Sequence, residues 1–247
     1  VTLVDGYTEA EADAEFVTKT GDSMTGGLTI TTADNTNQLT IVSTDADASV
    51  GPALDLYRNS SSPADGDRLG SITLRGRNDN SQDVTYATIR AFAADVSDGT
   101  EDTEFELATI LAGTEVARMT TTGPETVFNQ AGADIDFRVE SNGNANMLFV
   151  DGGNDAVGIG CVPSSIQSGF DTLQIGGNLT LNVDSTGVGS GVYMGNNVYR
   201  DSGNSRWEYI YTDEASQYLQ ANGTHVWRTA ASGSADAAIT FSESMRI

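Results

Sequence analysis

The sequence predicts an elongated all-β protein built of stacked antiparallel hairpin or sandwich modules, with one short helix near the N-terminus. Hydrophobic residues make up 38% of the 247 positions, below the usual globular share, so we expect a thin core spread along the chain. Glycine occurs 27 times, and with Thr, Ser, Asn and Asp it supplies turns and exposed strand faces. Alternating strand patterns recur roughly every ten residues, as in sandwiches and barrels.

The strand predictions depend on an alternation of period two that begins after Gly26. Residues 134–140 alternate strictly between charged and apolar side chains, and residues 38–42 also alternate. Residues 206–211 alternate in their aromatic positions. Half-buried strands show this pattern because successive side chains point to opposite faces. In residues 105–111, one predicted face carries Phe105, Leu107, Thr109 and Leu111, and the other carries Glu106, Ala108 and Ile110.

Three dipeptides predict tight hairpin turns. Asn142-Gly143 and Asn222-Gly223 each separate two strand patterns, and Asn-Gly favours the left-handed backbone of such a turn. Ala112-Gly113 and the glycine-rich residues 151–154 predict further turns. Most contacts are therefore expected to be local.

The helix is predicted at a capping box near the N-terminus. Thr8 is placed to cap the helix, and Glu11 follows three residues later. The acidic residues up to Glu15 suit a helix N-terminus. The alternative is a solvated acidic segment.

Four regions follow from these patterns: an N-terminal attachment segment (1–28), a first β module (29–123), a short hairpin or shaft module (124–170) and an aromatic-rich distal β domain (171–247). Residues 26–30 are echoed by residues 176–181, without a strict repeat. Modules this short cannot close a core alone, so each must stack on its neighbours or on other copies.

The charge balance excludes some partners. The chain carries 35 acidic and 12 basic residues, for a net charge of −23, which repels phosphate backbones and anionic lipid heads. We therefore expect no nucleic-acid partner. No stretch approaches 18 apolar residues, so we expect no membrane insertion.

Residues 20–30, Thr-Gly-Asp-Ser-Met-Thr-Gly-Gly-Leu-Thr-Ile, resemble the Gly-Asp-Thr-Met-Thr-Gly-x-Leu segment of bacteriophage tail fibres, with Ser23 in place of threonine. Residues 67–77, 98–102, 136–141 and 157–160 resemble fibre modules of marine and cyanobacterial phages. The resemblance implies a homotrimeric fibre on the virion. Its N-terminal segment would attach to a tail, adaptor or portal-proximal protein, and the fibre would bind a host surface glycan or protein.

Two groups of residues are candidate binding sites. Both tryptophans and five of the eight tyrosines follow residue 190; such rings either stack on sugars and anchor interfaces or fill a thin distal core. The receptor-binding candidates are Trp207, Tyr209, Tyr211, Tyr218 and Trp227. In the N-terminal segment, which would insert into a partner or else be a disordered tail, the virion-docking candidates are Val4, Tyr7, Phe16 and Val17.

Catalytic and metal chemistry find little support in the sequence. His225 is the sole histidine, and Cys161 is the sole cysteine with no second candidate base near it in sequence, so we expect no enzyme and no cofactor. Asp151 and Asp155 are weak metal-ligand candidates in a turn that lacks the distal glutamate of an EF-hand loop, and the alternative is a polar hairpin tip.

The sequence leaves three functions open. The first is a virion fibre that adheres to the host surface, where several weak sites on one rod gain avidity. The second is a decoration fibre on the capsid or neck with a structural role. The third is a glycan-degrading tailspike that works through paired carboxylates.

Overall fold

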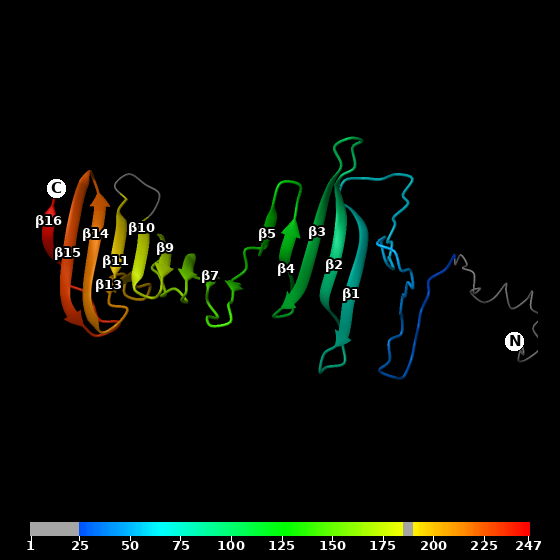
Figure 1. Ribbon diagram of the computed structural model, residues 1–247, viewed down its shortest axis with the longest axis horizontal. Helices are drawn as coiled ribbons and strands as arrows, with labels where there is room; N and C mark the ends of the chain where they lie inside the picture. Colours follow the sequence, from blue (N-terminus) through cyan, green and yellow to red (C-terminus); the bar gives the residue numbers. More distant parts are fainter. Residues whose placement is uncertain (1–24, 185–189) are drawn as a thin grey trace, which may run out of the picture. The chain divides into compact units, whose positions relative to one another are not determined.

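A computed structural model describes residues 25–184 and 190–247, in which sixteen strands and no helix occur (Figure 1). The all-β prediction is confirmed. The chain divides into two compact units, Val1–Asp55 and Leu56–Ile247, and every strand lies in the second. The helix predicted at Thr8 lies outside the described residues.

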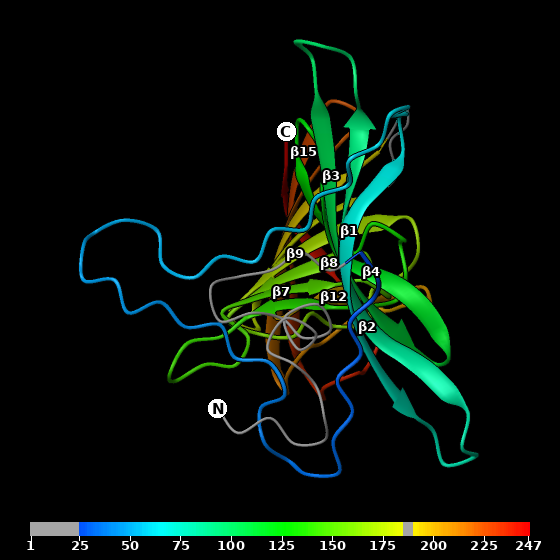
Figure 2. The ribbon, with the colours of Figure 1, turned by 90° about the vertical axis from the view of Figure 1, so that its right-hand side faces the viewer.

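The first sheet contains five antiparallel strands in chain order, which Figure 2 shows from a second direction. On one face, Arg90 contacts the carboxylates of both Glu106 and Glu115, the latter at 2.8 Å. Buried charges need such partners. The strands are β1 (Asp67–Arg77), β2 (Asp83–Asp95), β3 (Asp102–Leu111), β4 (Thr114–Thr121) and β5 (Thr126–Phe128).

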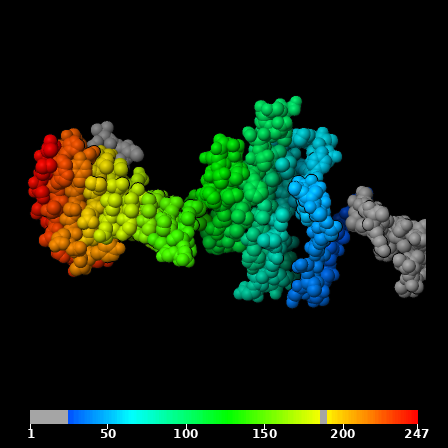
Figure 3. Space-filling view, in the orientation of Figure 1, coloured from blue at the N-terminus to red at the C-terminus, as the bar shows by residue number. Residues whose placement is uncertain are grey.

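The second sheet contains nine strands in the order β16-β15-β14-β11-β10-β9-β8-β7-β6 (Figure 1). In the space-filling view of Figure 3 its C-terminal residues are coloured orange to red. All neighbours are antiparallel except β8 and β9, which are parallel and depart from the predicted hairpin pattern. The strands are β6 (Phe137–Val139), β7 (Leu148–Asp151), β8 (Ala156–Ile159), β9 (Phe170–Ile175), β10 (Leu179–Asp184), β11 (Val192–Asn196), β14 (Asp213–Ala221), β15 (Thr224–Gly233) and β16 (Ser242–Arg246). A separate two-stranded ribbon is formed by β12 (Tyr199–Arg200) and β13 (Trp207–Glu208).

Two of the three predicted tight turns are confirmed. Asn222 and Gly223 join β14 to β15 with φ angles of 50° and 73°, the left-handed pair that a two-residue hairpin needs. Ala112 and Gly113 join β3 to β4 with φ angles of 47° and 85°. Between β6 and β7 the chain reverses through residues 140–147, and neither Asn142 nor Gly143 has a left-handed φ, so the tight turn predicted there does not form.

Three strand predictions differ from the structure. Residues 38–42 form no strand, although they alternate, because no neighbouring backbone pairs with them in the described chain. The predicted strands 134–140 and 206–211 shorten to Phe137–Val139 and Trp207–Glu208. Alternation predicts which face of a sheet a side chain occupies. A strand forms only where a neighbouring strand pairs with its backbone.

One face of the second sheet is covered by its own chain, and we call it the covered face. Thr172 and Asn182 hydrogen-bond each other across β9 and β10 at 2.7 Å. Thr180 Oγ1 donates to the Val198 carbonyl at 2.8 Å, and the Ser164 amide donates to Gln174 Oε1 at 2.8 Å. Polar side chains of the sheet therefore fix the position of the covering loops through their backbones.

Two small clusters form the core between the covered face and these loops. Ala156 packs against Ile166 and Tyr199, and Ala215 and Ala230 pack against Tyr209. Alanines of the strands thus leave room for larger side chains from the loops.

The predicted region boundaries can be placed on these sheets. The 123/124 boundary lies between β4 and β5, and the 170/171 boundary lies inside β9. The first boundary, at 28/29, lies before the first strand.

Replacing Gly158 with alanine should lower the unfolding midpoint by several degrees. A Cβ atom there would overlap the Cys161 carbonyl oxygen and lie 3.0 Å from Pro163 Cδ. Overpacking of this kind costs about 1–3 kcal/mol. Thermal unfolding followed by circular dichroism measures the change. Gly143→Ala is the control, because nothing lies within 4 Å of its added Cβ, and it should leave the midpoint unchanged.

Candidate functional site

The second sheet carries an unbroken row of apolar residues on the face opposite the covered one, which we call the open face. Each residue of the row lies directly opposite the next in the strand register, so the row crosses all nine strands. None of these side chains is charged. We call it the apolar row; its members are Phe137, Val150, Val157, Leu173, Leu181, Met194, Tyr218, Trp227 and Met245.

Much of the apolar row is accessible in the single chain. Met194 is 49% exposed, Met245 47% and Leu181 38%. Val183 and Val192, which pair beside the row, are also exposed. Large contiguous apolar patches on a soluble chain mark interaction surfaces.

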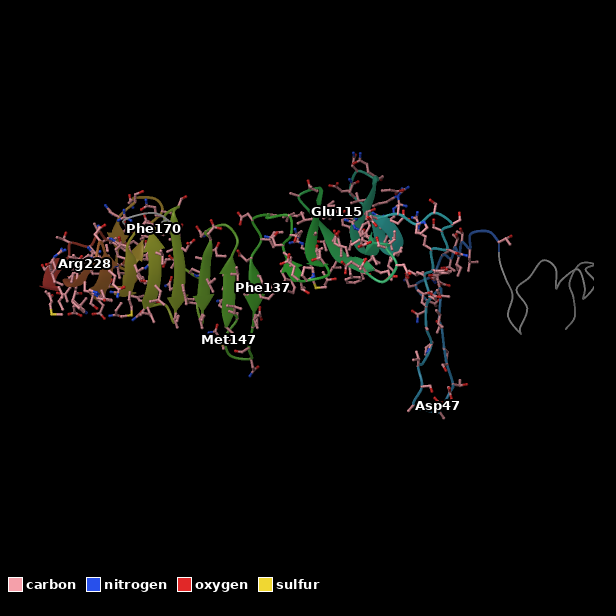
Figure 4. The ribbon with its side chains drawn as sticks, turned by 90° about the horizontal axis from the view of Figure 1, so that it is seen from above. Asp47, Glu115, Phe137, Met147, Phe170 and Arg228 are labelled. Atoms are coloured by element: carbon pink, nitrogen blue, oxygen red, sulfur yellow. The ribbon has the colours of Figure 1, made fainter. Side chains whose placement is uncertain are left out.

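The adjacent row, on the covered face, has the opposite character. Gln174, Thr180 and Gln217 lie directly next to the apolar residues along their strands, and all three are buried. Figure 4, which looks along the sheet, labels Phe170 and Arg228 of the covered face and Phe137 of the open face. The sheet thus buries its polar side beneath its own loops and leaves its apolar side open.

The first sheet repeats this arrangement. An apolar row again crosses every strand, and its exposed members include Ile72 at 47% and Phe128 at 52%. The neighbouring row on the other face includes the buried residues Glu106 and Thr120. The first-sheet row consists of Ile72, Ile89, Leu107, Met119 and Phe128.

The two rows meet where one sheet follows the other. Phe128 ends the row of the first sheet and Phe137 begins the apolar row, and their ring centroids lie 5.0 Å apart. Aromatic rings at this distance attract each other beyond simple burial.

Two hollows open on the second sheet beside the apolar row. One, of about 320 Å³, is lined by Met194, Tyr218 and Trp227 among others. The other, of about 640 Å³, is lined by Leu173, Leu181 and neighbouring residues. Both are apolar depressions of the kind that receive side chains of a partner surface.

The five receptor-binding candidates do not form one site. Tyr218 and Trp227 belong to the apolar row, with ring centroids 4.9 Å apart. Tyr209 is buried at 5% exposure and donates to the Ala231 carbonyl, so it is a core residue. Tyr211 is exposed. Trp207 lies in the ribbon at the covered face, away from the row.

Trp207 is the centre of an aromatic cluster. The ring of Tyr193 lies 4.9 Å from it and that of Phe170 5.9 Å, the latter edge to face. Tyr193 donates its hydroxyl to Asp184 at 2.9 Å. Burial, followed by this carboxylate, raises the pKa of Tyr193. The hydroxyl therefore stays protonated and the cluster stays fixed.

The remaining sequence candidates have these positions. The virion-docking candidates Val4, Tyr7, Phe16 and Val17 lie outside the described residues. Among the described residues, no group of three or more His, Cys, Asp or Glu side chains is arranged to hold a metal ion. Asp151 caps its own turn, where Oδ1 accepts the amides of Gly153 and Asn154 at 3.1 and 2.9 Å, and Asp155 follows with a left-handed φ of 51°.

The histidine and the cysteine are engaged in local contacts. His225 Nδ1 shares a hydrogen bond with the Tyr218 hydroxyl, and its ring stacks near Trp227. Cys161 is a free thiol whose Sγ donates to the Gln174 carbonyl at 3.6 Å.

A pair of carboxylates meets at one tyrosine hydroxyl. Tyr199 Oη lies 3.0 Å from Glu208 Oε2 and 3.2 Å from Asp236 Oδ1, and one hydroxyl proton satisfies one of them at a time. Glu208 is 2% exposed and also accepts from Asn204 and Arg206. This cluster joins the ribbon to residue 236 from inside the fold.

The sequence did not identify the open face, and it did not identify Arg200 and Arg228 as candidate binding residues. The available signal was alternation in residues 179–184 and 192–196, where leucine, valine and methionine recur at every second position. Alternation identifies an apolar face, and it leaves open whether that face turns inward.

No family model and no curated protein matches this chain. Within the described residues, no helix has the length and apolar character needed to cross a membrane.

Replacing Tyr199 with phenylalanine should destabilise the fold by about 1–2 kcal/mol at pH 7, because a buried hydrogen bond is lost. Burial, Glu208 and Asp236 raise the pKa of Tyr199 above its ordinary value of 10.0. The native protein holds this proton more tightly than the unfolded chain, so the contribution is complete below pH 10 and falls as the pH rises further. Denaturant unfolding at pH 7 and pH 11 should show a smaller difference at pH 11.

Tyr211→Phe serves as the control for this experiment. Tyr211 is exposed, and among the described residues its hydroxyl has no hydrogen-bond partner. Its removal should leave stability unchanged at both pH values. An equal loss in the two variants would contradict the role given to the Tyr199 hydroxyl.

Proposed function

We propose that this chain is the subunit of a phage virion fibre, in which three copies associate through their open faces and mediate attachment to a host cell surface. The observation that carries the assembly is the pair of apolar rows, open on one face while the polar face is buried. The phage assignment is supported by the resemblance of residues 20–30 to tail-fibre sequences.

Association through the open faces fits the charge of the chain. Each copy carries a net charge of −23, so copies repel one another at a distance. The apolar row itself contains no charged side chain, and the carboxylates nearest to it, Asp155 and Asp171, lie at the edge of one hollow. Burying a fully exposed large apolar side chain contributes about 1.5–3 kcal/mol, and a residue such as Met194, at 49% exposure, has about half of that left to gain. Two rows on every copy give many such contributions to set against the repulsion.

Copies of this chain suit the open face better than an unrelated partner. Both sheets present the same kind of row, and the rows touch at Phe128 and Phe137. Closed symmetry around one axis would let identical faces cover one another. Three sheets facing an axis would bury all their rows together, which agrees with the trimer that the resemblance implies.

Replacing Met194 with aspartate should disrupt the assembly. Met194 is central in the apolar row, and a carboxylate there would be buried without a partner at a cost of several kcal/mol. Light scattering coupled to gel filtration should give three times the chain mass of 25.9 kDa for the unaltered protein and a smaller mass for the variant.

Val162→Asp is the matched control for this change. Val162 is also an exposed apolar residue, at 51%, but it lies in the loop after β8. The control should keep the trimer mass. A monomeric mass for the unaltered protein would sink the proposed assembly, and so would dissociation of both variants.

Attachment is tested on the particle. Gold-labelled antibody against this chain should decorate tail fibres in electron micrographs of the phage, and added protein should compete with the phage for adsorption. Label on the head or neck without competition would favour the structural decoration fibre. Release of reducing sugar from host polysaccharide would favour the glycan-degrading tailspike.

A further inference from the structure

Most arginines in this acidic chain contact a carboxylate. The basic residues are Lys19 and eleven arginines, and all eleven arginines lie in the described part of the chain. Seven of them contact a carboxylate within 4 Å. Among described residues, the four that do not are Arg68, Arg118, Arg200 and Arg228. With 35 acidic residues available, these exceptions call for an explanation.

Two of the four converge on one aromatic ring. The guanidinium carbon of Arg200 lies 5.5 Å from the ring centre of Trp207, and that of Arg228 lies 5.9 Å from it. Arg200 comes from the ribbon and Arg228 from β15 of the sheet, so the fold brings together positions far apart in sequence. Phe170 and Phe241 lie 5.6 and 4.3 Å from Arg200 and Arg228, respectively.

Each of the two guanidinium groups lies against Trp207, and neither has a carboxylate partner among the described residues. Arg200 Nε donates to Gln167 Oε1 at 2.7 Å. Arg228 donates to Gln217 Oε1 from both Nε, at 2.9 Å, and Nη2, so its Nη1 is the nitrogen left for a ligand. Both acceptors are neutral amides. Burial lowers the pKa of Arg228, Tyr193 raises it in part, and the positive charge of Arg200 lowers it by a smaller amount. Holding two like charges together costs free energy that an anion between them would recover.

Two further observations point to a missing acceptor. Gln217 is 3% exposed, and its Nε2 donor has no hydrogen-bond partner among the described residues. The nearby carboxylate of Asp184 is occupied by the Tyr193 hydroxyl and the Gly191 amide. The cluster therefore has more donors than acceptors.

We infer that Arg200 and Arg228 bind the carboxylate of an acidic saccharide, of the uronic acid class, at the aromatic cluster around Trp207. This inference rests on the proposed function, for which it names the ligand class. Each copy would carry one such site, on the face opposite the apolar row, so assembly through the open faces leaves the sites unblocked.

The chemistry favours a carboxylate over a more highly charged anion. The planar fork of a guanidinium matches the two oxygens of a carboxylate. At the contact itself the net charge of −23 repels one carboxylate less than a phosphate dianion, and salt screens the charges elsewhere on an acidic oligosaccharide. Tyr193 and Trp207 are half-buried rings of the kind that contact the body of a sugar.

The test measures binding of oligogalacturonate to the assembled protein by titration calorimetry at physiological ionic strength, where salt screens the long-range repulsion. The unaltered protein should bind the acid form and should not bind the fully methyl-esterified form, which differs only in its carboxylates. Arg200→Gln and Arg228→Gln should each weaken binding about tenfold or more, since each removes a charge-assisted hydrogen bond. Unfolding midpoints and assembled masses establish that the variants fold.

Arg68→Gln is the matched control. Arg68 also lacks a carboxylate partner among the described residues, and its guanidinium lies 5.4 Å from the ring centre of Phe92 in the first sheet. This variant loses the same charge and should bind normally. If Arg228→Gln does not fold, Arg200→Lys replaces it: the charge remains, the fork is lost, and binding should still weaken.

Three results would overturn the inference: no binding of the acid form, equal binding of the ester, or equal weakening by Arg68→Gln. Inorganic phosphate that binds as tightly as the oligosaccharide would overturn the saccharide class. The proposed function fails separately, when label is absent from the fibres or the protein does not compete for adsorption. If the Arg200→Gln and Arg228→Gln variants still compete with the phage for adsorption, attachment does not depend on this site. The inference then fails while the proposed function stands.

Discussion

The structure depends on which face of each sheet is exposed to solvent. Successive residues of a strand point to opposite faces of the sheet. The polar row that neighbours the apolar row along the strands therefore lies on the other face. In both sheets the polar row contains the buried residues and the apolar row is open. Buried polar groups are stabilised by hydrogen bonds, and Thr172, Gln174 and Thr180 of this face make such bonds. The covering loops are therefore held by directional hydrogen bonds, and the apolar side remains free for a partner.

The internal core is small as a consequence. Its sheet-side members are Ala156, Ala215 and Ala230, which bury little area each. The larger side chains come from the ribbon and the segment that follows it, as Tyr199 and Tyr209 do. A chain with such a core has little hydrophobic stabilisation of its own, so burial of the open faces would add a large share of the total. Folding and assembly would then be coupled, and stability would depend on protein concentration.

Local patterns could be predicted from the sequence because local chemistry determines them. The turn at Asn222-Gly223 needs left-handed backbone at two adjacent residues, and the dipeptide supplies it regardless of surroundings. Residues 38–42 have strand character but no partner, and partners cannot be inferred from alternation. The same limit hid the open face, since alternation does not say which side is covered. The cluster around Trp207 draws Arg200 and Arg228 from separate elements, so no sequence window contains it.

The acidity of the chain and a site for an acidic ligand are compatible because the two effects act over different distances. The net charge of −23 repels an anion at long range, but salt screens that repulsion beyond about 8 Å at physiological ionic strength. The attraction of Arg200 and Arg228 acts at contact, beside half-buried rings where screening is weaker. Salt should therefore help an acidic ligand to approach before it weakens the contact itself. A weak site of this kind, repeated on each copy of an assembly, gains avidity from several contacts with one polymer and discriminates against small anions that can occupy only one.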